Sequence, residues 1–168
     1  RTLDSFAESL KQLVPQLAGV GLLSSNHGGA RAMAQWGRSF LHYPVSGRSY
    51  QVSMGSFFQV NRFLLAGFLD LVTGGRTGRL AWDLYAGVGF FTLGLAFDRV
   101  LAVEAAPSSA FDLKRNLEAT GHRAVPSATL DFLRKKAAKT SRERPDLIVL
   151  DPPRAGLGPE VSRHLVEI

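Results

Sequence analysis

Apolar strands alternate with helical segments through the second half of the chain. Short apolar runs occupy 80–84, 100–103 and 147–150, and a weaker one occupies 123–125. Segments with helical periodicity lie before and between them, at 61–72, 91–97, 108–120 and 130–139. Continuous apolar strands separated by helices are typical of a parallel sheet covered on both faces. The pattern predicts an α/β fold with a doubly wound parallel sheet and strand order 3-2-1-4.

The first fifty residues have a different pattern. Apolar positions between Leu3 and Leu17 follow helical spacing and predict an amphipathic helix over 1–18, ended or kinked by Pro15. From Gly19 to Tyr50, glycines separate short apolar stretches, which predicts short strands and turns. We therefore expect a partial helix and strand region at 1–50 and an α/β domain at 51–168.

Composition and net charge limit the kinds of function and location that we expect for this chain. The net charge of +6 suits a polyanionic partner such as RNA, although a solvated basic face has the same signature. The chain has no Cys, which excludes disulfides and cysteine nucleophiles within it, and His27, His42, His122 and His164 are scattered, so no metal is expected. No apolar run is long enough to span a membrane and no export signal is visible. We expect a cytoplasmic protein without a membrane partner.

The segment 82–92, WDLYAGVGFFT, joins the first strong strand to the next expected helix. Gly87 and Gly89 lack the Cβ atoms that would keep a ligand from the backbone, and the N-terminus of the helix would direct unpaired N–H groups toward it. Thr92 stands where dinucleotide-binding loops have a third glycine. Asp83 would repel a pyrophosphate but can accept hydrogen bonds from a cationic ligand. The loop therefore favours S-adenosylmethionine over NAD.

Two further carboxylates end later strands. Glu104 lies 21 positions after Asp83 and can accept hydrogen bonds from both hydroxyls of a ribose, which NAD and S-adenosylmethionine share. Asp151 ends the run 147–150, and the two prolines after it restrict the direction of its carboxylate. Ligands of parallel α/β sheets bind at the carboxyl ends of the strands. Both acids are therefore candidates for contact with a nucleoside ligand.

Four segments, in this order and spacing, resemble the RNA uracil-5-methyltransferase family. They are Phe57-Phe58-Gln59-Val60-Asn61, Asp83-Leu84-Tyr85-Ala86-Gly87-Val88-Gly89, Glu104 and Asp151-Pro152-Pro153-Arg154-Ala155-Gly156. The resemblance spans about 47–156 and implies the Rossmann-like fold of class I methyltransferases, with S-adenosyl-L-methionine as cofactor. It implies cofactor contacts by Gln59, Tyr85, Glu104 and Asp151, with the backbone around Gly87 and Gly89 beside the methionine part.

The resemblance also implies a reaction. In that family a cysteine adds to C6 of the uracil, C5 takes the methyl group, and a glutamate removes the C5 proton. The chain has no Cys and ends at Ile168, so we expect the cofactor-binding part of a longer enzyme, inactive alone and without a catalytic residue. The whole enzyme is expected to methylate uridine in rRNA or tRNA after splaying the base from its stack.

Three alternatives remain open on the sequence. The chain fits a methyltransferase that acts on another RNA base position. Its charge and lack of Cys also fit a non-catalytic RNA-binding protein that retained the fold. The glycine loop and Glu104 fit an NAD-dependent oxidoreductase, which Thr92 and Asp83 disfavour.

Overall fold

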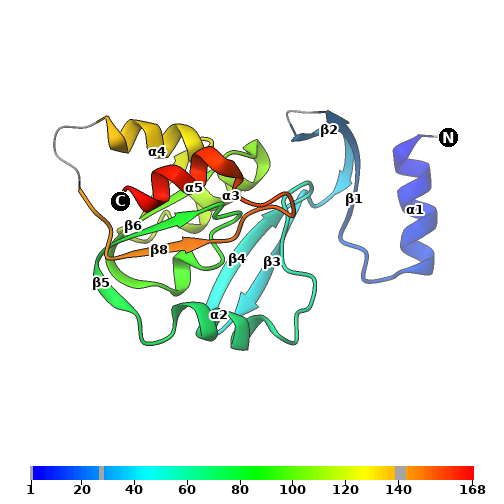
Figure 1. Cartoon of the computed structure of the whole chain (residues 1–168). Helices are drawn as coiled ribbons and strands as arrows, with labels where there is room; N and C mark the ends of the chain where they lie inside the picture. Colours follow the sequence, from blue (N-terminus) through cyan, green and yellow to red (C-terminus); the bar gives the residue numbers. More distant parts are fainter. Residues whose placement is uncertain (1, 27–28, 139–142) are drawn as a thin grey trace.

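The computed structural model describes residues 2–26, 29–138 and 143–168 (Figure 1). His27 lies outside the described residues. The elements, in chain order, are α1 (Leu3–Leu13), β1 (Gly19–Asn26), β2 (Gly29–Gly37), β3 (Phe40–Val45), β4 (Arg48–Ser53), α2 (Leu65–Thr73), β5 (Thr77–Leu84), the 3-10 turn η1 (Thr92–Gly94), β6 (Ala96–Glu104), α3 (Pro107–Asn116), β7 (Arg123–Pro126), α4 (Thr129–Ala137), β8 (Leu147–Leu150) and α5 (Gly158–Val166). None of the helices described is long and apolar enough to cross a membrane.

The central sheet has four parallel strands in the order β7-β6-β5-β8. These are the third, second, first and fourth strands expected in the second half of the chain, so the predicted order 3-2-1-4 and the α/β class are confirmed. Asp83 on β5 pairs with Ala102 on β6 and with Val149 on β8. The register brings the carboxyl ends of the three strands to one edge.

One face of the sheet is covered by α4 and α5 (Figure 1). The alternate residues Leu80, Trp82 and Leu84 of β5 are buried on this face, together with Phe132 from α4 and Val161 from α5. The rings of Trp82 and Phe132 meet edge to face, with their centroids 5.0 Å apart. Period-two side-chain alternation thus directs the bulky residues of β5 toward the two helices.

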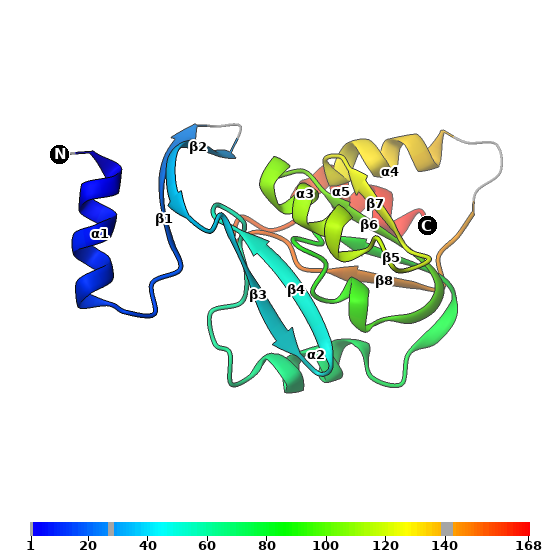
Figure 2. The ribbon, with the colours of Figure 1, turned by 180° about the vertical axis from the view of Figure 1, so that it is seen from behind.

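The opposite face packs against α2, α3 and the β3–β4 hairpin. Ala81 and Val100 share a buried cluster with Leu69 of α2, and Ala102 packs with Leu113 of α3. Figure 2 shows α3 close to the hairpin, and β4 is the hairpin strand that contacts α3. Both faces are covered, as the doubly wound pattern predicts.

The helix expected at 91–97 does not form, and only the short turn η1 occupies its place. The reason lies in the length of β5. Its eight residues extend about 26 Å, and Ala96 must return to the level of Thr77 to start β6. The eleven residues 85–95 would cover only about 16 Å as a helix. Residues 85–95 instead form a series of turns that includes η1, and no long helix points its N-terminus at the glycine loop.

The N-terminal helix α1 and the two-stranded sheet β1–β2 lie to one side of the main sheet in both views (Figures 1 and 2). The helix α1 ends at Leu13, before Pro15. The β3–β4 hairpin, in contrast, contributes Val45 and the fully buried Tyr50 to the core under β5. The division at residue 50 stays a prediction, and that position falls inside β4.

Candidate cofactor site

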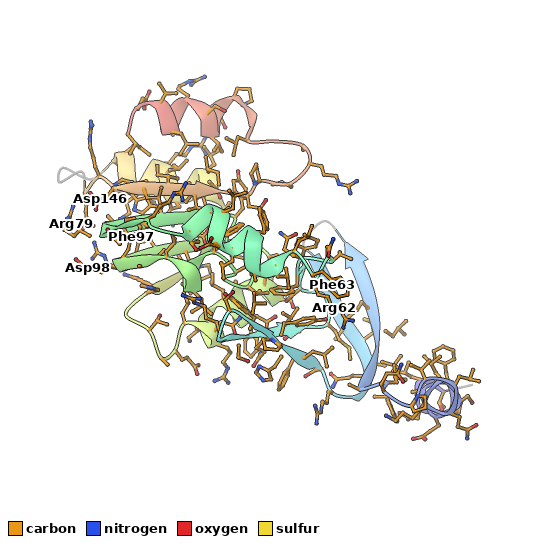
Figure 3. All side chains as sticks on the ribbon, turned by 90° about the horizontal axis from the view of Figure 1, so that it is seen from below. Arg62, Phe63, Arg79, Phe97, Asp98 and Asp146 are labelled. Carbon is orange, nitrogen blue, oxygen red and sulfur yellow. The ribbon has the colours of Figure 1, made fainter. Side chains whose placement is uncertain are left out.

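A cavity of about 620 Å³ opens at the carboxyl edge of the sheet. Five of the seven residues predicted to bind the cofactor line it: Gln59, Tyr85, Gly87, Glu104 and Asp151. Asp83 and Gly89 are not in the lining. Figure 3 shows Arg79, Phe97, Asp98 and Asp146 gathered where the strands begin, at the other end of the sheet. The loops after β5, β6 and β8 therefore converge on one site.

The glycine loop has an unusual backbone. Tyr85, Gly87 and Gly89 have φ values of 64°, 57° and 91°, and such values cost a bulky residue like Tyr85 about 1–3 kcal/mol. A Cβ at Gly87 would meet no atom within 4 Å, whereas one at Gly89 would lie 2.8 Å from Cδ1 of Leu113. Gly87 thus leaves the loop open at the cavity wall, and Gly89 lets the loop pack against α3.

Backbone N–H groups of two loops hold the carboxylate of Glu104 in position. Its Oε2 accepts a hydrogen bond from the backbone N–H of Gly87 at 2.8 Å, and its Oε1 accepts one from the N–H of Ala106 at 2.7 Å. Each carboxylate oxygen has a second lone pair. The geometry leaves Glu104 able to accept two further hydrogen bonds, as a ribose with two hydroxyls requires.

Asp83 lies behind the cavity wall and is fully buried. Its Oδ2 accepts a hydrogen bond from Oγ1 of Thr92 at 2.5 Å, while Oδ1 has no partner among the described residues. Burial raises the pKa of Asp83 to about 7; the hydrogen bonds from Thr92 oppose the rise, and the charges of Asp151 and Glu104 add to it. Glu104 and Asp151 therefore give the cavity an acidic lining in a chain of net positive charge, with Asp83 buried behind it.

Aromatic rings form another wall of the cavity. Phe58, Phe90 and Phe91 line it, and the centroids of Phe58 and Phe90 lie 5.7 Å apart. The hydroxyl of Tyr50 donates a hydrogen bond to the carbonyl of Phe90 at 3.2 Å. Phe57 also lines the cavity and remains 66% exposed. These rings escaped the site prediction because apolar residues at the ends of elements look like ordinary core residues.

The buried Asp112 of α3 anchors the chain that leads to Phe57. It accepts hydrogen bonds from Nε2 of Gln51, from the N–H and Oγ of Ser53, and from Oγ of Ser56, at 2.7–3.0 Å. Only the tertiary structure reveals this role, because no local signal joins α3 to a segment more than fifty residues earlier. Asp112 thereby holds the chain just before Phe57 and Gln59 against α3.

Proteins with similar sequences indicate what kind of ligand such a cavity binds. No family model matches the chain. A sequence relative, an uncharacterized RNA methyltransferase of Streptomyces avermitilis, is 35% identical over 141 residues, which cover 79% of this chain and 32% of that protein. A tRNA (uracil(54)-C(5))-methyltransferase of Pyrococcus furiosus is 28% identical, covering 77% and 31%. The chain is related to RNA methyltransferases. It spans about a third of the length of these relatives.

Solved structures of methyltransferases have the same fold. The tRNA (uracil-54, C5)-methyltransferase of Pyrococcus abyssi, in complex with S-adenosyl-L-homocysteine, matches 92% of this chain with a TM-score of 0.69 at 21% identity; the match covers 40% of that protein. The M. jannaschii tRNA m1G37 methyltransferase matches 98% of the chain and 49% of its own length with a TM-score of 0.60 at 13% identity. The predicted methyltransferase fold is confirmed, and the resemblance seen in the motifs agrees with the sequence relatives.

Proposed function

We propose that this chain binds S-adenosylmethionine in the cavity at the carboxyl edge of the sheet. The observation that carries the proposal is the convergence of Tyr85, Glu104 and Asp151, from three separate loops, on one cavity. Its volume falls within the range of about 300–1,000 Å³ common for small-ligand sites. Glu104 has free lone pairs for the ribose, and the acidic lining suits a ligand that carries a sulfonium and an ammonium group.

We further propose that the protein methylates C5 of uridine in RNA, rRNA or tRNA, in the cytoplasm. The bound cofactor supplies an electrophilic methyl group. Uracil C5 is a poor nucleophile until a thiolate adds to C6. After C5 takes the methyl group, a base must remove the C5 proton as the thiolate leaves C6, which restores the ring double bond. These 168 residues contain no Cys, so the proposal requires the thiol to come from outside them. The motifs shared with uracil-5-methyltransferases and the P. furiosus relative support this assignment.

A methyltransferase acting on another base position is the second candidate. It is favoured by the likeness of the fold to an m1G37 enzyme. The two candidates differ in the hydrogen that leaves the base. Release of tritium from RNA carrying 5-tritiated uridine, assayed with the protein in its natural length, supports uracil C5. Methylation without that release selects the second candidate.

Calorimetry tests cofactor binding by the chain itself. We expect saturable binding of S-adenosylmethionine and S-adenosylhomocysteine, and none of NADH, because the acidic lining repels a pyrophosphate. Binding of NADH alone would end the methyltransferase proposal. The chain alone should release no tritium from the labelled RNA, since it lacks the thiol, and release would show that the reaction needs no thiol from elsewhere.

A further inference from the structure

A second cavity, of about 560 Å³, lies between the β3–β4 hairpin and α3 and shares no lining residue with the first. Figure 2 shows this side of the molecule, where β4 passes beside α3. Phe40, His42 and Gln51 line it from the hairpin, and Phe111 and Arg115 line it from α3. No step of the proposed methyl transfer uses these side chains. We call this cavity the α3 groove.

Two exposed aromatic rings mark the α3 groove. Phe40 is 38% exposed and Phe111 is 53% exposed, although phenylalanine is usually buried. The guanidinium of Arg115 lies 5.5 Å from the centroid of the Phe111 ring, and the His42 ring meets Phe40 edge to face at 5.4 Å. Exposed rings beside a planar cation are the surface on which unpaired bases stack. The groove therefore offers the chemistry of a nucleobase site.

A phosphate partner is also available. Arg115 donates to Oε1 of Glu118 at 2.9 Å, and both side chains are more than half exposed. An exposed pair of this kind contributes little stability. An RNA phosphate, which accepts two parallel hydrogen bonds from a guanidinium, can displace Glu118 from Arg115. Glu118 thus keeps the Arg115 guanidinium oriented in the groove, and little stability is lost when an RNA phosphate replaces Glu118.

The α3 groove and the cofactor cavity adjoin through one short segment. Gln51 and Ser53 line the groove, and both bind Asp112, which also accepts a hydrogen bond from Ser56. The next residue, Phe57, lines the cofactor cavity. Gln51 and Phe57 are no more than about 21 Å apart along the chain. A single extended strand of RNA can therefore reach both sites.

We propose that the α3 groove binds an unpaired nucleotide of the RNA whose target base enters the cofactor cavity, with its base on Phe111 and a phosphate on Arg115. The identity of the substrate rests on the proposed function, whereas RNA binding in the groove is measured independently of cofactor. The ligand class is single-stranded RNA, recognised through stacking and one backbone contact, without a requirement for a particular base.

Fluorescence anisotropy with a labelled single-stranded RNA of about ten nucleotides tests the proposal. We expect Phe111→Ala to weaken binding at least about fivefold without changing its salt dependence. Arg115→Gln should weaken binding and reduce the salt slope by about one contact. Glu118→Gln should strengthen binding, because it frees Arg115 and removes a negative charge. A general loss of structure would weaken RNA binding in both neighbouring variants, so it cannot explain a loss of affinity in Arg115→Gln together with a gain in Glu118→Gln.

Matched controls lie elsewhere on the surface. Phe6 of α1 is also 53% exposed, and Arg134 of α4 forms an exposed pair with Glu160. Phe6→Ala and Arg134→Gln should bind the RNA like the unaltered chain. Wild-type binding of RNA by Phe111→Ala and Arg115→Gln overturns the proposal, as does absence of RNA binding by the unaltered chain. Self-association that Phe111→Ala abolishes, with RNA binding unchanged, assigns the groove to a protein partner and also overturns it.

Calorimetry of the same variants with S-adenosylmethionine separates the two proposals. We expect Phe111→Ala to bind the cofactor normally. If the unaltered chain binds no cofactor while RNA binding still depends on Phe111, the proposed function fails and the groove stands. If the unaltered chain binds the cofactor but its RNA binding does not depend on Phe111, the groove proposal fails and the proposed function stands.

Discussion

The two ends of strand β8 carry aspartates with contrasting surroundings. Asp146, just before the strand, accepts hydrogen bonds on Oδ2 from the backbone N–H groups of Leu80 at 2.9 Å and Arg79 at 2.8 Å, and these lower its pKa. Figure 3 shows Arg79 and Asp146 together at that end of the sheet. Asp151, just after the strand, lines the cavity, and its carboxylate has no hydrogen-bond or ion-pair partner among the described residues.

The contrast extends to the whole of each sheet edge. At the end where strands begin, Glu143 pairs with both Arg79 and Arg99, and Asp146 is held by two backbone N–H groups. At the carboxyl end, Glu104 has two backbone N–H donors and Asp83 has the hydroxyl of Thr92, while no ion pair among the described residues involves Asp83, Glu104 or Asp151. A carboxylate paired with a cation or with strand N–H groups stabilises the fold, whereas acids without a cation beside an open cavity are suited to a cationic ligand. Three predictions test this distinction.

The largest effect is expected at Asp83, the buried acid of the carboxyl edge. Its pKa in the folded chain is about 7, above its ordinary value of 3.8, so the folded state retains a proton that the unfolded chain releases. Stability from this group is complete below pH 4 and is lost as pH rises toward 7, by an amount on the order of 4 kcal/mol. Asp83→Asn should remove that part of the pH dependence.

Chemical denaturation of Asp83→Asn and the unaltered chain at pH 5 and pH 8 measures this difference. The asparagine variant should gain stability relative to the unaltered chain at the higher pH. An equal difference at both values would contradict the prediction, because it would mean that Asp83 does not titrate in this range.

The second effect concerns cofactor affinity at Glu104. Glu104→Ala removes a charged acceptor for the ribose, and we expect binding of S-adenosylmethionine to weaken by roughly 1–3 kcal/mol. Glu104→Gln, which retains one oxygen acceptor for a backbone N–H, should lose less. Calorimetry measures both variants, and an unchanged affinity for the alanine variant removes Glu104 from the site.

The smallest effects distinguish the two aspartates that flank β8. Asp151→Ala should weaken cofactor binding roughly tenfold, through loss of one charged partner, while the melting temperature stays the same. Asp146→Ala should do the opposite, lowering the melting temperature and leaving affinity unchanged, since it leaves two backbone N–H groups without their acceptor. Calorimetry and thermal melts of the matched pair provide the test. Identical behaviour of both variants refutes the division between the edges.

Local sequence signals predicted most of the α/β part. The run 147–150 is β8 to the residue, and the four strands have the predicted order. Such runs are readable because a strand buried on both faces must be apolar along its whole length. The ends of β5, β6 and β8 carry four of the predicted lining residues, Tyr85, Gly87, Glu104 and Asp151, for the same reason, since strand ends are visible in the sequence.

Other features depended on contacts between distant segments. The helix expected at 91–97 is excluded by the length of its neighbouring strand, which no local propensity records. The position of Phe57 and Gln59 depends on Asp112 of α3. Asp112 binds Ser53 and Ser56, which precede it by more than fifty residues.

The sequence by itself determined which segments are strands and which acids end them, because apolar periodicity and the position of a carboxylate are properties of neighbouring residues. Only the tertiary structure decided what each acid does. Asp83 lies near the end of β5, and Asp146 and Asp151 flank β8. Yet the first is buried against Thr92, the second accepts hydrogen bonds from backbone N–H groups of β5, and the third is open to the cavity. The energy of a carboxylate depends on the donors and charges that other strands bring within a few ångströms.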